Sequence, residues 1–334
     1  MTHISLGDMA QAFALRRGTG GLKAEIRRFS TEVTTGRAAD SARAVSGDLA
    51  PLAAIETSLI RATGFRAVTS EAALLAAGMQ RVLEHVDGRA TALSSGLLRA
   101  STLGDPTSID AIAAEGAQAF DTAVSALNTR LGDRTLFAGQ ATGGAAIAGS
   151  AAILDAVAAA ASGAVTAAAV ETAVRGWFND PAGFAALAYR GGNPLDPVPV
   201  TPEDRVEIGV TAADPALRDT LAGLAMAALL ERGLPSGDPQ ARADLARRAG
   251  VHLAATATDR AGLAARIGAA EARIETAAQR NAAETSALEI ARAGLLVVDD
   301  YTAATRLEAA QTQLETLYAV TARMSRLSLV NFLR

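Results

Sequence analysis

The sequence predicts a mainly α fold, in which long antiparallel helices from both chain ends form a coiled-coil rod that carries a small α+β insertion in the middle. Half of the 334 residues are apolar but only 4% are aromatic, which favours helices that pack closely through small side chains. Apolar residues recur at three- and four-residue spacing toward both chain ends, as on one face of a helix. Between residues 140 and 212, glycine, proline and aspartate become frequent instead.

The N-terminal helices are predicted from apolar stripes that turn signals interrupt. Leu22, Ile26, Phe29 and Val33 follow a four-three-four spacing, and Gly36 then ends the pattern. Later stripes are separated in the same way, most clearly by a Gly-Asp-Pro sequence. We therefore expect further helices whose stripes run through Leu52–Leu59, Leu75–Leu97 and Phe120–Leu131, with a break at Gly104-Asp105-Pro106.

The C-terminal third contains one long seam. From Leu263 to Val298 apolar residues keep three- and four-residue spacing for about five heptads, which predicts a coiled coil. Asn281 and Glu284 are polar members that weaken the seam locally and could fix its register. A last helix is expected to start at Asp299-Asp300, whose charges complement the helix dipole.

The middle of the chain has a different pattern. Four prolines between Pro194 and Pro202 exclude a helix there. Four aromatic residues within 177–189 predict a compact small core. Alternation over Arg205–Val210 predicts a short strand, with a hairpin partner near Tyr189. The alanine-rich stretch Ala145–Val170 is expected to be a helix or loop, because Asp155 and the few large apolar residues disfavour a membrane span.

These patterns divide the chain into three parts. Residues 1–45 plus 290–334 are expected to form a terminal coiled-coil assembly domain. Residues 46–139 plus 213–289 are expected to form a helical rod domain. Residues 140–212 are expected to form a small variable outer insertion with a short β element.

The composition and the motifs argue against an enzyme, a metal site and a nucleic-acid partner. The net charge of −4 disfavours a nucleic-acid partner, which calls for a basic surface. The N-terminus lacks the pattern of a cleaved signal peptide. There is no cysteine, and the three histidines share no ligand spacing. Gly18–Lys23 lacks the preceding strand and the Ser or Thr of a phosphate loop. We therefore expect no enzyme activity, no catalytic or metal site, no cofactor and no membrane insertion.

The two chain ends carry a resemblance to a known family. Tyr301–Arg334 resembles the C-terminus shared by flagellins and hook-associated proteins, in which a Leu-x-x-x-Gln-x-Gln-Leu run leads to a Leu-Ser-Leu ending. Leu22–Val33, followed by Thr34-Thr35-Gly36-Arg37, resembles the helix and Ser/Thr-Gly-Arg turn near the N-terminus of that superfamily. The matching C-terminal positions are Leu307, Gln311, Gln313, Leu314, Leu317, Leu327, Ser328, Leu329 and Leu333.

Two middle segments resemble the member at the hook-filament junction. Leu136-Phe137-Ala138-Gly139 is similar to the Phe-x-Gly turn that closes its N-terminal rod, and Tyr189–Gly191 followed by Val206–Asp219 is similar to its short β region. The sequence departs from the family where an Asp-Asp-Pro usually follows the Thr-Gly-Arg turn, since Ser46–Pro51 stands there. Gly18, Gly20 and Gly21 also fall inside an expected helix, and each costs about 1 kcal/mol relative to alanine.

The resemblance implies a structural subunit of the bacterial flagellum that joins hook to filament by self-assembly. It implies export without a cleaved signal peptide to an extracellular position, and as partners other copies of the chain, a second hook-associated protein, flagellin and a flagellar export chaperone. A short flagellin forming the filament itself is the first alternative, and a helical signalling coiled coil is an alternative from another class. The expected assembly interface comprises Leu22, Ile26, Phe29, Val33, Gly36, Arg37, Leu307, Gln311, Leu314, Leu317, Met324, Leu327, Leu329, Phe332 and Leu333.

Overall fold

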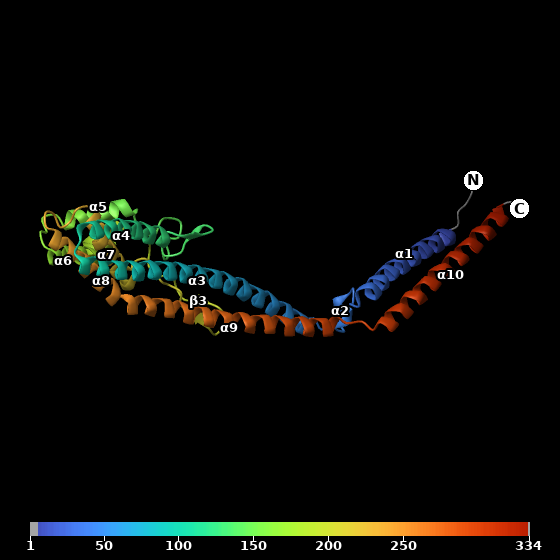
Figure 1. The fold of residues 1–334 in the computed structure, drawn as a ribbon. Coiled ribbons are helices and arrows are strands. Elements are labelled where there is room, and N and C mark those ends of the chain that lie inside the picture. Colours follow the sequence, from blue (N-terminus) through green and yellow to red (C-terminus); the bar gives the residue numbers. More distant parts are fainter. Residues whose placement is uncertain (1–5, 333–334) are drawn as a thin grey trace. The chain divides into compact units, whose positions relative to one another are not determined.

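The chain folds into two compact units, shown in Figure 1, and each is described by itself. The computed structural model describes residues 6–332, with side chains at 9–10 and 13–324. The terminal unit comprises residues 1–63 and 282–334, and the central unit comprises residues 64–281. Long helices from both chain ends dominate, which confirms the predicted mainly α fold with its small β elements. The finer division into three parts stays a prediction.

Two long helices build most of the terminal unit. Helix α1 (Leu6–Thr35) and helix α10 (Asp300–Phe332) lie side by side and antiparallel (Figure 1). Helix α1 continues through its three glycines without a break. A Cβ atom placed on Gly18 would lie 3.7 Å from Cδ2 of Leu317, in ordinary contact, so α10 lies directly against this glycine-rich stretch. Packing against α10 thus supports a helix that would be marginal alone.

The two connections at the base of this helix pair are tied together. Gly36 ends α1 with a φ of 64°, as the sequence predicted. Arg37 then forms an antiparallel bridge with Val297, between α9 (Ala257–Leu296) and α10. The backbone N–H of Ala38 donates to the carbonyl of Leu296 at 2.8 Å, and that of Val298 donates to Gly36 at 3.1 Å. The segment entering the helix pair and the segment leaving it therefore form one short two-stranded neck, followed by α2 (Ser41–Ala44).

Helix α3 runs from Ala50 to Leu103. The prediction of two separate helices in this stretch is wrong. No strong helix breaker lies between the two apolar stripes, and a lone glycine such as Gly64 costs only about 1 kcal/mol inside a helix. The predicted break at Gly104-Asp105-Pro106 is confirmed. Gly104 has a φ of 67°, and the Asp105 carboxylate accepts the Ser108 N–H at 3.0 Å at the start of α4 (Pro106–Leu127).

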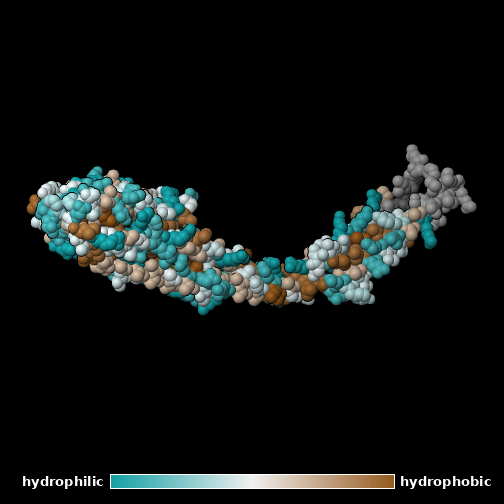
Figure 2. Space-filling view, viewed as in Figure 1, coloured by the Kyte–Doolittle hydropathy of each residue, from teal (hydrophilic) through white to brown (hydrophobic). Residues whose placement is uncertain are grey.

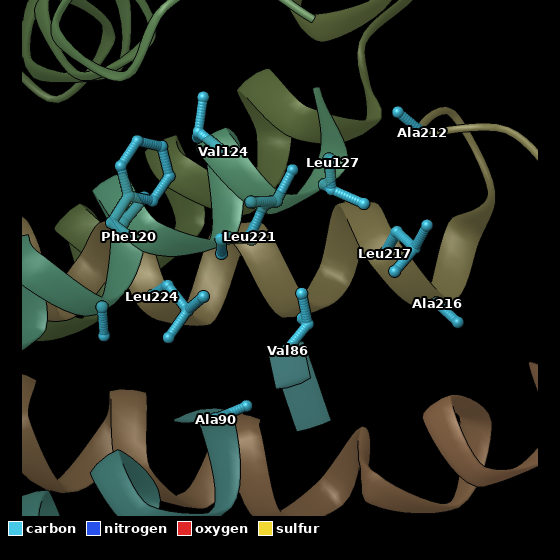
Figure 3. Close-up of a cluster of buried hydrophobic side chains, with 14 of the residues drawn as sticks. Val86, Ala90, Phe120, Val124, Leu127, Ala212, Ala216, Leu217, Leu221 and Leu224 are labelled. Carbon is cyan, nitrogen blue, oxygen red and sulfur yellow. The ribbon is translucent and has the colours of Figure 1, made fainter. Parts of the chain in front are cut away.

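The core of the central unit is built around α7 (Pro215–Glu231). Thirteen of its residues are buried, which is typical of a helix that is apolar on all sides and packed all round. Figure 3 shows Phe120 and Val124 of α4 on one side of α7, with Ala90 of α3 on the other. Helix α8 (Pro239–Ala255) packs on α7 so closely that a Cβ on Gly223 would lie 2.5 Å from Leu253.

Short elements fill the middle of the chain. They are the hairpin β1–β2 (Arg130–Leu131 with Arg134–Thr135), α5 (Ser150–Ala160), α6 (Ala167–Asn179), a π-helix at Pro181–Ala188, and the pair β3–β4 (Val198–Pro199 with Arg205–Val206). The alanine-rich stretch Ala145–Val170, expected to be a helix or loop, thus contains α5, a loop and the start of α6. Among the described helices, none is both long enough and apolar enough for a membrane span.

Two expectations for this region are corrected. The predicted strand over Arg205–Val210 is only two residues long, and its partner is β3 rather than the segment near Tyr189. Tyr189 instead bridges Ile147. The aromatic cluster does form, with the Trp177 ring 5.0 Å from Phe178. Its side chains belong to the continuous core of the central unit rather than to a separate one, because α6 packs directly on α7 and α8.

Candidate assembly interface

The expected interface residues of α1 and α10 form a stripe that the helix pair closes incompletely. On α1, Phe29 is buried, Leu22 and Ile26 are half-buried, and Val33 is exposed. On α10 the described residues that become fully buried are small ones, Ala303 and Ala310. The larger Leu307, Leu314, Leu317 and Met324 are only half-buried, and Gln311 is exposed.

A shallow groove of about 300 Å³ lies along this stripe. Leu22, Leu317 and Val320 line it together with Thr312 and Thr316. Both threonine hydroxyls already donate to carbonyls of their own helix, at 3.0 and 2.9 Å, so the groove needs no polar partner for them. On the face seen in Figure 2, apolar residues of this helix pair reach the surface. The groove is therefore suited to an apolar side chain from another molecule.

Gly36 and Arg37 serve a different purpose from the stripe. Both lie in the neck, where they shape the backbone and pair with the segment before α10. The neck is further held by the buried Glu32, whose carboxylate accepts the N–H of Ala39 at 3.3 Å. These residues thus position α1 and α10, and the Arg37 side chain is exposed.

The start of α10 behaves as the sequence predicted. Asp299 precedes the helix, and its carboxylate accepts the backbone N–H of Thr302 at 2.7 Å. Hydrogen bonds from the Thr302 side chain and backbone hold the pKa of the Asp299 carboxyl below its usual value. The charged carboxylate therefore caps the helix at neutral pH.

Four predicted interface residues lie outside the part of the chain with described side chains. The side chains of Leu327, Leu329 and Phe332 lie outside the described residues, and so does all of Leu333.

The seam of α9 contains surface that the expected interface did not include. Its members from Leu263 to Asn281 are buried. The Asn281 amide donates to the Thr69 hydroxyl at 3.2 Å and to the Val200 carbonyl at 3.0 Å, as expected for a residue that fixes register. Beyond Asn281 the spacing continues, but its large apolar members Leu288, Leu295 and Val298 are only half-buried. The uninterrupted heptad spacing is the signal that could have identified this second unfilled stripe.

The Phe-x-Gly turn is part of the central unit. Phe137 is fully buried, and its carbonyl accepts the N–H of Ala212 at 2.9 Å. Gly139 has a φ of 57°, and a Cβ there would lie 2.2 Å from the Asn193 carbonyl oxygen. The turn after α4 is thereby bonded to the segments that return toward α7. Burial raises the pKa of the Tyr189 phenol, which donates to Gly192 at 2.6 Å in the same cluster.

No side-chain cluster in the described part of the chain has the ligands of a metal centre. Histidine, aspartate and glutamate residues do not gather there in groups of three or more that could hold an ion. The described surface carries ion pairs, apolar stripes and grooves instead.

Comparison with known proteins gives one family match. Residues 251–333 match the family model described as the bacterial flagellin C-terminal helical region. No curated protein matches the chain. One similar solved structure is described as a flagellar hook-associated protein from Vibrio parahaemolyticus, with 13% identity, coverage of 73% of this chain and 95% of that chain, and a TM-score of 0.48.

Proposed function

We propose that the chain, whose residues 251–333 match the bacterial flagellin C-terminal helical region, is a structural subunit that joins the flagellar hook to the filament. It acts by self-assembly and by contact with neighbouring axial proteins. The observation that carries this proposal is the contrast in burial between the two units. The central unit has a continuous core, whereas the stripe through Leu22, Leu314 and Leu317 stays half-buried.

Burial of this stripe between copies would supply the driving force for assembly. Covering apolar surface stabilises by about 25 cal/mol per Å², so completing several half-buried leucines contributes a few kcal/mol per subunit. The same stripe is too thin to stabilise the helix pair strongly in one copy. We therefore infer that the stripe is completed by neighbouring subunits.

The finer assignment to the junction rests on the middle of the chain. The Phe137–Gly139 turn and its hydrogen bonds from Gly192 and Ala212 support the resemblance to junction proteins. The proposed partners are other copies of the chain, a second hook-associated protein, flagellin and an export chaperone. The proposed location is the extracellular flagellum, reached without a cleaved signal peptide.

A charge placed in the groove tests the role of the stripe. Leu317→Asp should leave melting of the central unit nearly unchanged and permit secretion, yet stop filament growth, because an unpaired buried charge costs several kcal/mol per subunit. Ala319→Asp, which adds the same charge at an exposed position of α10, should swim normally. Normal swimming of Leu317→Asp, or global unfolding of that variant, would contradict the assigned role.

Two measurements separate the alternatives. Electron microscopy of a deletion strain should show hooks without filaments. Protein counting in purified filaments should find the chain as a trace component, whereas a short flagellin would be the bulk of the material. A signalling coiled coil would leave both hooks and filaments intact on deletion.

A further inference from the structure

We propose that residues Val297–Tyr301 of one copy dock into a cationic, apolar groove on the central unit of a second copy. This inference rests on the proposed self-assembly, and it assigns a specific pair of complementary surfaces to it.

The groove lies between α3 and the β1–β2 hairpin and has a volume of about 430 Å³. Buried Val82 and Leu136 form part of its apolar lining, and Leu131 on the hairpin is 38% exposed beside them. Pockets that enclose ligand groups commonly measure roughly 300–1,000 Å³. The groove is therefore large enough to take an aromatic side chain.

The titratable residues that line this groove are all basic. Arg81, His85 and Arg130 line it, and no carboxylate does so among the described residues. Neither Arg81 nor Arg130 forms an ion pair in the described part of the chain. Their guanidinium groups donate only to backbone carbonyls, Arg81 Nε to Ala77 at 3.2 Å and Arg130 to Gly143 and Asp133 at 3.2 and 2.9 Å.

The neighbouring arginine shows what these two lack. Arg134, on the next strand of the hairpin, is 2.8 Å from the Glu71 carboxylate. Arginine binds carboxylates through paired, charge-assisted hydrogen bonds. The groove thus offers two guanidinium groups that can donate hydrogen bonds to a carboxylate of another molecule.

The complementary surface lies where α9 gives way to α10. Two strongly exposed apolar residues, Val297 (68%) and Tyr301 (80%), flank the exposed pair Asp299-Asp300. Figure 2 shows apolar residues gathered at the surface near the end of α9. A tyrosine contributes about 150–250 Å² of burial, and the adjacent carboxylates match the sign of the groove.

This segment is also preorganised. Val297 is held by its bridge to Arg37, and Asp299 by its hydrogen bond from Thr302. A segment fixed before binding loses less conformational entropy when it docks. Because the two surfaces differ, the contact is heterologous, and repeated heterologous contacts generate rings or helical assemblies rather than closed dimers.

A charge swap tests the pairing in the full-length protein. Arg81→Glu and Asp300→Arg should each raise the critical concentration for sedimentable polymer by at least about tenfold. The coupling energy of close charge pairs at interfaces exceeds the free energy that corresponds to a tenfold change. The double variant should recover to near the wild-type value. Arg99→Glu, an exposed arginine elsewhere on α3, serves as the control and should assemble normally.

Recovery in the double variant supports the docking. Single variants that assemble like Arg99→Glu, or a double variant no better than the worse single variant, would overturn it while leaving the proposed self-assembly intact. Wild-type protein that forms no polymer at any concentration would overturn both.

Cross-linking provides a second readout. The chain has no cysteine, so Leu131→Cys and Tyr301→Cys proteins can be mixed and oxidised. A disulfide between the two different variants should dominate over disulfides between identical ones. Equal yields of all three products would contradict the docking, even if the charge variants behave as expected.

Discussion

Replacing Gly139 by alanine should destabilise the central unit strongly, because this buried turn residue has no room for a side chain. The backbone there has a φ of 57°, which costs an L-residue about 1–2 kcal/mol. The new Cβ would also lie 2.2 Å from the Asn193 oxygen and 2.8 Å from the Gly192 oxygen, well below the usual carbon–oxygen contact of about 3.3 Å. The turn must therefore move.

Movement of the turn disrupts two hydrogen bonds. The N–H of Gln140 donates to Asn193, and that of Gly192 donates to Ala138, each at 2.9 Å. Each such bond contributes about 0.5–1.5 kcal/mol. Together with the backbone strain, the expected loss in the free energy of unfolding is about 2–5 kcal/mol.

Gly132→Ala provides the matched control. Its φ is 59°, and a Cβ there would meet no atom within 4 Å, so it should lose only the strain of about 1–2 kcal/mol. Urea unfolding followed by the fluorescence of Trp177, the single tryptophan, measures both variants. Equal losses for the two substitutions would refute the steric argument.

Three further predictions concern other parts of the chain. Trp177→Ala should lower the free energy of unfolding of the central unit by about 3–5 kcal/mol, measured by circular dichroism, because a nearly buried aromatic side chain leaves a cavity. Gly20→Ala with Gly21→Ala should raise the helix content of the monomer, since neither new Cβ meets an atom within 4 Å and each gains about 1 kcal/mol of helix propensity; unchanged ellipticity would count against a stable α1. Because the pKa of Asp299 in the folded protein is lowered, its helix cap should persist at neutral pH and be lost as the pH falls through that pKa. NMR should show the Thr302 amide resonance shifting in acid in the wild type but not in Asp299→Ala.

The sequence predicted the apolar stripes of the helices better than it predicted which of these stripes are buried within one copy. Apolar spacing located the stripes of α1, α9 and α10, because periodicity specifies which face is apolar. It did not show that burial of the α9 seam ends at Asn281, since a stripe has the same pattern whether its partner lies in the same chain or in another.

The errors have local causes. The hairpin near Tyr189 was wrong because strand alternation identifies a strand without naming its partner, and Val198–Pro199 carries no alternation of its own. The division of α3 overestimated the effect of weak apolar spacing, since a helix continues wherever no residue stops it. The groove on the terminal unit is lined by residues of both α1 and α10. The apolar stripe of either helix alone does not predict its shape.

The neck at the base of the α1–α10 pair has a mechanical consequence. A segment joined to its neighbours by one strand can swivel about single bonds, but here two antiparallel strands run together and are held by the hydrogen bonds of Ala38 and Val298. Rotation of the helix pair about the neck would have to wind one strand around the other and break those bonds. Torque applied to α1 and α10 is therefore carried by two bonded segments of the backbone acting together, rather than dissipated at a free joint.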